Sequence, residues 1–401
     1  CETADCCVAS SGGAVGTLTN QVAETDSTIL YMVQGVAVSP DGKNVYVTSG
    51  STTGGSITHW DCDTATGALS NQVSKTDNTN FQGATGVMVS PDGKFVYSTW
   101  WYSNSIVYWD RDTTTGVLSN QVNLRDNTNL DGALYVTLSP DGKNVYVVGA
   151  ECDSIVYWDR DTATGALSNQ VNLIDSTNLD NPRCVIVSPD GKNVYATGLN
   201  SDSIVHWDRD TATGALSNQV NLKDSTNLDG IRSVAIAPDG KNVYAVAQSS
   251  DSIVHWDRDS TTGALSNQVN LKDSTNLDDA FFVAVSPEGM SVYAVASNSD
   301  SIVHWDRDTT TGVLSNQVNL KDSTNLDNAR MVVVSPTGSN VYAIALGSTS
   351  LISWDRSSAD TCSTFSCIAG YSVSNTNTVC ATVGCDADEC ICSADSCTST
   401  L

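Results

Sequence analysis

Three arginines stand at equivalent places of a repeated sequence in an otherwise acidic chain. Arg183 and Arg232 are 49 residues apart, and Arg330 follows after twice that interval. A guanidinium binds a carboxylate, phosphate or sulfate through two parallel hydrogen bonds, so a group of arginines suits an anionic ligand. Neighbouring carboxylates offer a simpler role, in which the arginines pair with Asp180, Asp229 and Asp327. The sequence is compatible with either role.

Three consecutive aromatic residues, Trp100, Trp101 and Tyr102, replace the small polar residues that other copies carry, such as Gln248 to Ser250. Exposed aromatic rings stack on sugars or anchor a protein partner. Packing against a neighbouring loop explains them equally well. With the three arginines, they are the candidate binding residues of this chain.

The remaining reactive side chains do not suggest a catalytic set. Each of the four histidines, at 59, 206, 255 and 304, precedes a repeated tryptophan, where other copies carry tyrosine or serine; this indicates a packing role. Turns such as Asp208-Arg209-Asp210 contain oxygen ligands that suit calcium, although an aspartate that caps its own turn is a simpler account. The sequence therefore predicts no catalytic residue, metal site or cofactor, with calcium at these turns as the alternative.

A 49-residue repeat must position these residues. A Trp-Asp pair returns seven times at this interval, beginning at residues 60, 109, 158, 207, 256, 305 and 354. A period of this length, built from short strands, is typical of β-propeller blades. One copy contains four strand-like segments, at 233–237, 242–247, 252–257 and 264–269. The repeat predicts an all-β, seven-bladed propeller with four-stranded blades.

The last copy lacks its fourth strand. After residue 356 the chain enters a Cys-rich tail, whereas residues 16–22 match the outer strand of the other copies, such as residues 67–73. We expect this N-terminal strand to complete blade seven and close the ring. The predicted organisation is a Cys-bearing head at 1–15, a propeller at 16–356 and a disulfide-rich tail at 357–401. The starts of the inner strands then surround the mouth of a central channel, at Gln34, Thr85, Leu134, Arg183, Arg232, Phe281 and Arg330.

Three motifs resemble a known family. They are Ser-Pro-Asp-Gly-Lys-Asn-Val-Tyr at 139–146, the Ser-Ile-Val strand, as at 203–205, and Thr-Gly-Ala-Leu at 213–216. All three are similar to motifs of the seven-bladed lactonase propellers, which include surface repeats with a Tyr-Val-Thr-Asn signature. The resemblance implies the propeller fold across roughly 16–356. It gives no residue-by-residue match to the lactonase active site. The tail resembles a degenerate epidermal-growth-factor-like module, with Cys390-Ile-Cys392 in place of its Cys-x-Cys.

Thirteen cysteines indicate an oxidising compartment, because ten of them cluster in the head and tail and no zinc-like Cys and His spacing accompanies them. Cys152 and Cys184 are both expected at the mouth face of adjacent blades, so we predict a disulfide between them. Eleven cysteines then remain. An odd number cannot all be bridged within one chain, which predicts a link to a second molecule through the ends.

The net charge of -26 and a pI near 4.1 argue against nucleic acid and anionic membranes as partners. No stretch approaches the roughly 20 apolar residues of a membrane span. The near-identity of the copies suits repeated contacts better than catalysis. The sequence therefore favours an extracellular, non-enzymatic subunit of a surface filament, matrix or appendage such as a flagellar hair, which binds itself or other extracellular proteins. The alternatives are a carbohydrate-binding module that takes glycans, and a lactonase-like hydrolase at the channel mouth.

Overall fold

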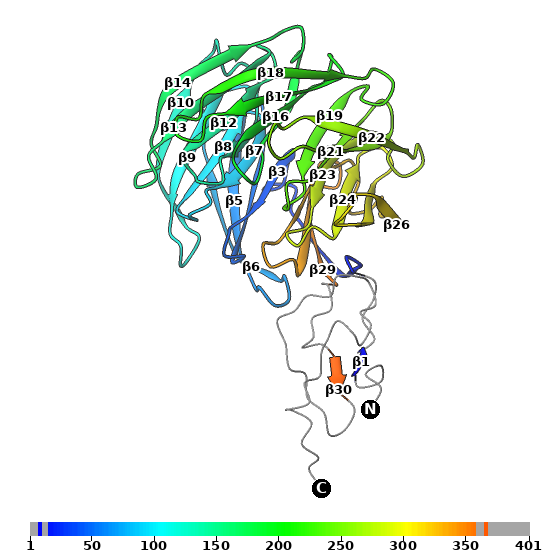
Figure 1. Cartoon of the computed structure of the whole chain (residues 1–401). Coiled ribbons are helices and arrows are strands. Elements are labelled where there is room, and N and C mark those ends of the chain that lie inside the picture. Colours follow the sequence, from blue (N-terminus) through cyan, green and yellow to red (C-terminus); the bar gives the residue numbers. More distant parts are fainter. Residues whose placement is uncertain (1–6, 10–14, 358–364, 368–401) are drawn as a thin grey trace, which may run out of the picture.

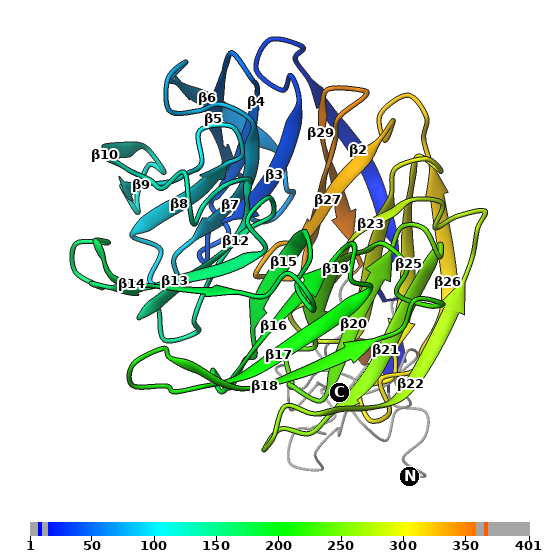
Figure 2. The same ribbon diagram turned by 90° about the horizontal axis from the view of Figure 1, so that it is seen from above.

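Seven four-stranded antiparallel sheets form a closed ring in the computed structural model of the chain (Figure 1). The structure describes residues 7–9, 15–357 and 365–367, and within these ranges it contains no helix, hence none that could cross a membrane. Seen from above, the inner strands surround the ring centre (Figure 2). The predicted all-β, seven-bladed propeller is confirmed.

Each sheet is one blade. In blades 1 to 6, the four strands follow one another in sequence from the ring centre outward. Blade 1 contains β3 (Val33–Val38), β4 (Asn44–Ser51), β5 (Gly54–Cys62) and β6 (Leu69–Thr76), and blade 2 contains β7 (Ala84–Val89), β8 (Phe95–Trp100), β9 (Ser105–Arg111) and β10 (Leu118–Arg125). Blade 3 contains β11 (Ala133–Leu138), β12 (Asn144–Gly149), β13 (Ser154–Arg160) and β14 (Leu167–Ile174), and blade 4 contains β15 (Pro182–Val187), β16 (Asn193–Gly198), β17 (Ser203–Arg209) and β18 (Leu216–Lys223). Blade 5 contains β19 (Ile231–Ile236), β20 (Asn242–Ala247), β21 (Ser252–Arg258) and β22 (Leu265–Lys272), and blade 6 contains β23 (Ala280–Val285), β24 (Ser291–Ala296), β25 (Ser301–Arg307) and β26 (Leu314–Lys321).

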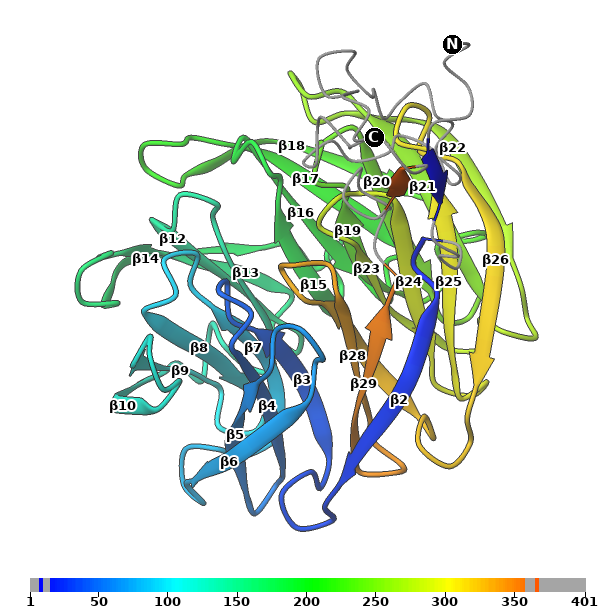
Figure 3. The same ribbon diagram turned by 90° about the horizontal axis from the view of Figure 1, so that it is seen from below.

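Blade 7 joins the two ends of the propeller. Its strands are β27 (Ala329–Val334), β28 (Asn340–Ala345), β29 (Ser350–Arg356) and, from the N-terminal side, β2 (Leu18–Thr25). Leu18 pairs with Arg356 and Thr25 with Ser350, and the strands lie side by side in Figure 3. Ring closure by the N-terminal strand is therefore confirmed, because β29 would otherwise leave its hydrogen-bonding edge open.

Interblade contacts hold the ring together through the repeated residues. The tyrosine of each second strand is buried, and in blade 4 the Tyr195 hydroxyl donates to the Gly263 carbonyl of the next blade at 2.6 Å. Arg258 of that next blade donates from Nε to the same hydroxyl at 2.9 Å and pairs with Asp190 at 3.2 Å. Apolar side chains fill the space around this unit, as in the cluster of Tyr195, Ile204, Ile231 and Trp256. The repeat thus supplies both the core and its polar clamps.

The described residues of the head and tail form one small two-stranded sheet. A short strand, β1 (Cys7–Ala9), pairs antiparallel with β30 (Phe365–Cys367). The predicted growth-factor-like module, including Cys390-Ile-Cys392, lies outside the described residues.

Candidate functional site

The channel mouth is built by one backbone position that takes a left-handed conformation in every blade. It is the residue directly before each inner strand, and its φ lies between 54° and 68°. Five copies use glycine or asparagine and blade 6 uses Asp279, all of which tolerate this conformation, whereas blade 1 carries Met32.

A cavity of about 240 Å³ opens at this mouth, on the face opposite the end of β29. All seven predicted mouth residues line it, from Gln34 and Thr85 to Arg330. Tyr135 and Phe282 come from opposite blades, and their rings lie 6.0 Å apart between centroids. Both rings line the cavity and contact each other across the channel. The sequence-based placement of the mouth is correct.

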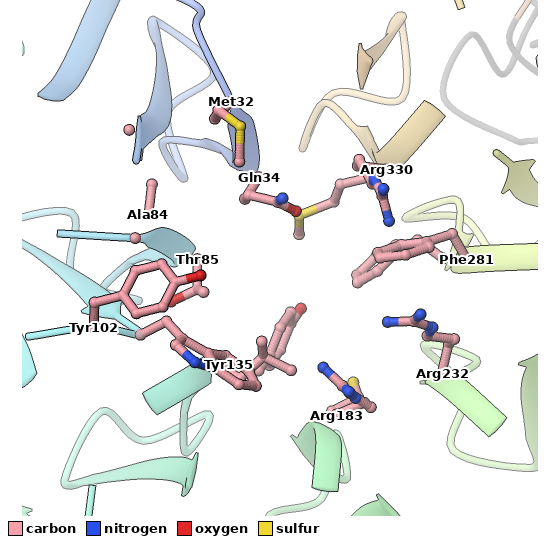
Figure 4. A pocket seen from close by; sticks show the side chains of 18 residues that line it. Met32, Gln34, Ala84, Thr85, Tyr102, Tyr135, Arg183, Arg232, Phe281 and Arg330 are labelled. Carbon is pink, nitrogen blue, oxygen red and sulfur yellow. The ribbon is translucent and has the colours of Figure 1, made fainter. Parts of the chain in front are cut away.

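The three predicted arginines converge on this cavity from blades 4, 5 and 7 (Figure 4). The Cζ atoms of Arg232 and Arg330 each lie 4.4 Å from the ring centroid of Phe281, and Figure 4 shows the ring between them. Arg183 lies 5.6 Å from the Trp101 ring. The arginine side chains therefore rest on aromatic faces.

These arginines form no close ion pair with a carboxylate of the described residues, although the charge of Glu151 favours protonated Arg183 and that of Asp279 favours protonated Arg232 and Arg330. Within residues 15–357 the eight ion pairs closer than 4.0 Å involve none of Arg183, Arg232 and Arg330, so the pairing with Asp180, Asp229 and Asp327 does not form. The buried Nε atoms of Arg183 and Arg330 lack a hydrogen-bond partner, while Arg232 Nε donates to Gln248. Such unsatisfied donors favour an acceptor on a ligand.

Burial and mutual repulsion destabilise the positive charges at the mouth. Desolvation lowers the pKa of Arg183 and Arg330 below the usual arginine range. For Arg232, desolvation together with the charges of Arg183 and Arg330 lowers the pKa to about 10, against a partly opposing effect of Asp279. All three remain charged at neutral pH. A bound anion would relieve this repulsion.

An outer recess of about 580 Å³ adjoins the cavity and shares Arg232 and Arg330 with it. Asp279 lies in this recess, and its carboxylate accepts a hydrogen bond from Ser297. Asp278 accepts one from Asn298 Nδ2 at 3.2 Å. Desolvation raises the pKa of the nearby Asp251. The recess places acidic groups beside the two arginines, which is an arrangement suited to proton transfer next to an anion.

The three aromatic candidates separate into two groups. Trp101 and Tyr102 line the cavity, and Tyr102 lies against Gly83, where a Cβ atom would come within 2.4 Å of its ring. Trp100 is buried, stacks on Phe81 with 4.5 Å between ring centroids, and donates from Nε1 to Ser98. The prediction of Trp100 as a binding residue is wrong, because alternate residues of a strand face opposite sides and its ring packs in the core.

The predicted disulfide between Cys152 and Cys184 is also wrong. Both are free thiols, as is Cys62. The Cys152 sulfur faces the carbonyl of Asn129 in its own blade at 3.3 Å, whereas the Cys184 sulfur points to Val234 in blade 5 at 3.8 Å. The two side chains diverge although their chain segments both approach the mouth. Burial raises the pKa of Cys184 to about 11, so this thiol stays protonated.

The metal-binding alternatives gain no support from the geometry. In the Asp208-Arg209-Asp210 turn, the carboxylate oxygens accept hydrogen bonds from amide groups, including Asn193, Asn218 and the backbone of Ala212. The described part of the chain contains no group of three His, Cys, Asp or Glu side chains that could hold a metal ion. His255 is buried against Tyr244 with 5.7 Å between ring centroids.

The protein-family model of the seven-bladed β-propeller lactonases matches residues 31–128, 125–226 and 234–334 of the sequence. The chain belongs to this lactonase family. No curated protein sequence matches it significantly. Within the lactonase propeller, the matched residues include all of blades 1 to 4 and 6, blade 5 from residue 234 onward, and every mouth residue from Gln34 to Arg330 except Arg232.

Solved structures share the fold of this lactonase-family chain. A putative 6-phosphogluconolactonase from Bacteroides fragilis aligns with a TM-score of 0.60 and 18% identity, covering 72% of this chain and 84% of its own. The periplasmic gluconolactonase of Pseudomonas aeruginosa gives 0.63 and 18%, covering 77% and 95%. Hydrazine synthase from Kuenenia stuttgartiensis gives 0.58 and 19%, covering 80% and 94%. At these identities the likeness concerns the fold.

These comparisons overturn the prediction of a structural filament subunit. The family and its structural neighbours include lactonases, and Cys62, Cys152 and Cys184 are free thiols. The repeat copies are nearly identical in their strands and most loops, which favoured a structural interpretation. Their residues differ at the channel mouth, where the cavity lies. Asp279 was missed although a signal existed: it stands where the five copies in blades 2, 3, 4, 5 and 7 have glycine or asparagine.

Proposed function

We propose that the protein is a lactonase-like hydrolase that opens the ring ester of a sugar lactone carrying an anionic group. The observation that carries this proposal is the convergence of Arg183, Arg232 and Arg330 on one cavity at the channel mouth, with no ion pair closer than 4.0 Å to any of them among residues 15–357. Family membership supports it independently. Trp101 and Tyr102 add aromatic faces against which a sugar ring would pack.

The proposed reaction is the addition of water to the lactone carbonyl. Asp279 would accept a proton from the water, and the new C–O bond would convert the carbonyl oxygen into an oxyanion. An arginine of the mouth would stabilise this negative charge, because an unpaired guanidinium in a partly dry site interacts strongly with developing charge. The oxyanion then re-forms the carbonyl as the ring C–O bond breaks, and the leaving alkoxide oxygen takes the proton from Asp279, which gives the hydroxy acid and restores the carboxylate. The remaining arginines would hold the anionic substituent.

The test compares glucono-δ-lactone with its 6-phosphorylated form, with acid release followed at constant pH. We expect hydrolysis above the spontaneous rate, faster for the phosphorylated substrate. Arg232→Ala should lower kcat/KM by about 100-fold. Arg125→Ala is the matched control, because Arg125 is exposed and bonds only to Asn127 at 3.0 Å among the described contacts. A folded protein that leaves both lactones at the spontaneous rate would contradict the proposal.

We also propose that the protein acts outside the cytoplasm. The similar Pseudomonas aeruginosa structure is that of a periplasmic enzyme, and the thirteen cysteines support an oxidising compartment. Fractionation of the source cells, with the protein detected by antibody, tests this location. Recovery in the cytoplasmic fraction alone would contradict it.

A further inference from the structure

The charged groups at the mouth share an unusual support, since aromatic rings rather than carboxylates hold them. Phe281 has a guanidinium over each face, from Arg232 and Arg330 at 4.4 Å, and Trp101 has one from Arg183 at 5.6 Å. Elsewhere in the ring the buried arginines pair with acids, as Arg258 does with Asp190 at 3.2 Å. Arg160 and Arg356 also lie over aromatic rings, at 4.9 and 5.9 Å, but each pairs with a carboxylate as well, so the mouth arginines differ in lacking that ion pair.

An aromatic face and a carboxylate have different consequences for a guanidinium. A carboxylate neutralises the charge and occupies its hydrogen-bond donors. A ring attracts the cation through its quadrupole, fixes the plane of the guanidinium and leaves the N–H donors free. The unpartnered Nε atoms of Arg183 and Arg330 agree with this second arrangement. Aromatic support therefore leaves these guanidinium groups able to donate hydrogen bonds to a ligand.

Phe281 also separates two like charges. The two guanidinium carbons lie on opposite faces of its ring, at most twice 4.4 Å apart, as Figure 4 illustrates. Blades 5, 6 and 7 contribute Arg232, Phe281 and Arg330 from equivalent positions, so the order arginine, phenylalanine, arginine follows the ring. An aliphatic side chain would fill the same space without attracting either cation. The position of an aromatic residue between two arginines thus has a specific physical effect.

We propose that Phe281 is a positioning residue that holds Arg232 and Arg330 as two separate, charged arms of a binding site for a phosphate or carboxylate group. Trp101 positions Arg183 in the same way. The proposal deepens the proposed function, and only its kinetic test rests on that function. The binding test below stands without it.

The binding test titrates the full chain with inorganic phosphate and, separately, with acetate, by calorimetry at low ionic strength. Phe281→Leu should weaken phosphate binding by about 10-fold, from the loss of two cation–π contacts. Phe281→Tyr retains the ring and should stay within about twofold of the natural protein. Phe81→Leu is the matched control, because Phe81 stacks on Trp100 and no arginine lies over its ring among the described contacts. The stronger of the two anions identifies the preferred group.

The kinetic test compares charged and neutral lactones. Phe281→Leu should raise KM for the phosphorylated lactone by about 10-fold more than it raises KM for the neutral lactone, whereas a general loss of structure would affect both lactones equally. Phe281→Met replaces this variant if the leucine protein does not fold. Unchanged phosphate affinity in either ringless variant, an equal loss in Phe81→Leu, or no anion binding by the natural protein would overturn the proposal. Anion binding without any lactone hydrolysis would leave it standing and reject the proposed function instead.

Discussion

Cys62 Sγ lies 2.8 Å from Tyr342 Oη at the interface between the first and last blades. At the other six interfaces an arginine occupies the place of Cys62, and its Nε donates to the equivalent tyrosine at 2.8 to 2.9 Å. The carboxylate that pairs with each of these arginines is replaced at the seventh interface by Thr337. Both members of the ion pair are absent together, so neither leaves a buried charge without its partner.

Restoring this ion pair should couple the two positions. Cys62→Arg alone places a guanidinium where no carboxylate balances it, whereas Cys62→Arg with Thr337→Asp recreates the unit of the other interfaces. We expect the double variant to be about 1 to 3 kcal/mol more stable than the sum of the single changes predicts. Urea unfolding of the four proteins in the cycle measures this coupling. Additive effects would show that the seventh interface cannot accommodate the pair.

Removing an existing clamp should be costly. Arg258→Ala leaves the Tyr195 hydroxyl and the Gly240 carbonyl without their donor, and Asp190 without its ion pair. The expected loss is about 3 kcal/mol in the free energy of unfolding, because buried polar groups are left unpaired. Arg125→Ala, on the exposed surface, should stay within about 0.5 kcal/mol of the natural protein. A similar loss in both variants would contradict a special role for the clamp.

Ring closure predicts rescue by a separate strand. Deleting residues 1–25 removes β2, together with the hydrogen bond from Trp354 Nε1 to Gln21 Oε1 at 3.2 Å, and exposes the edge of β29. We expect a lower melting temperature and aggregation. A synthetic peptide of residues 15–26 should restore part of the stability by strand addition, and a scrambled peptide should not. An unchanged melting temperature after the deletion would contradict closure by β2.

The sequence predicted the fold well because its information is local and repeated. A strand period and a turn recur in each copy, and the displaced strand at 16–22 is recognisable by its match to residues 67–73. The observed strand ends differ slightly from the predicted ones. For example, the strand predicted at 264–269 is β22, which spans Leu265–Lys272. The arginines at the mouth were also predictable, since topology alone brings the starts of the inner strands together.

The direction of individual side chains was not predictable to the same degree. Trp100 ends a strand and turns into the core, while the adjacent Trp101 lines the cavity. Cys152 and Cys184 approach the same face, but their sulfurs point to different blades. Such orientations depend on packing between blades, which sequence spacing does not determine. The aromatic support of the arginines likewise required the positions of the rings.

The buried histidines predict a loss of stability in mild acid. Desolvation lowers the pKa of His304 to about 4 from 6.5, and it lowers those of His59, His206 and His255. Between these two pH values the unfolded chain binds protons that the folded chain does not. Stability should therefore be complete above pH 6.5 and fall as the pH approaches 4, by up to about 3 kcal/mol for His304.

A variant with the residue of other blades isolates this effect. His304→Tyr introduces the tyrosine that blades 2 and 3 carry at the same place, Tyr108 and Tyr157. Its melting temperature should depend less on pH than that of the natural protein between pH 6.5 and 4, and the two curves should become parallel below that range. Identical pH profiles across the range would show that His304 contributes nothing to acid sensitivity.

Substitutions of Asp279 should separate an effect on lactone hydrolysis from an effect on folding stability. Its backbone has a φ of 56°, at a position where blades 2, 3 and 5 carry glycine. Asp279→Gly should therefore fold normally and gain up to about 1 kcal/mol, because glycine adopts this conformation without strain. Lactone hydrolysis should fall by about 100-fold or more, since the proposed general base is removed. Asp279→Asn retains an acceptor for Ser297 but has no basic carboxylate, and it should lose the same activity at unchanged stability. Thermal melts and rates measured on the same samples give both quantities, and a fully active Asp279→Asn protein would exclude the carboxylate as the base.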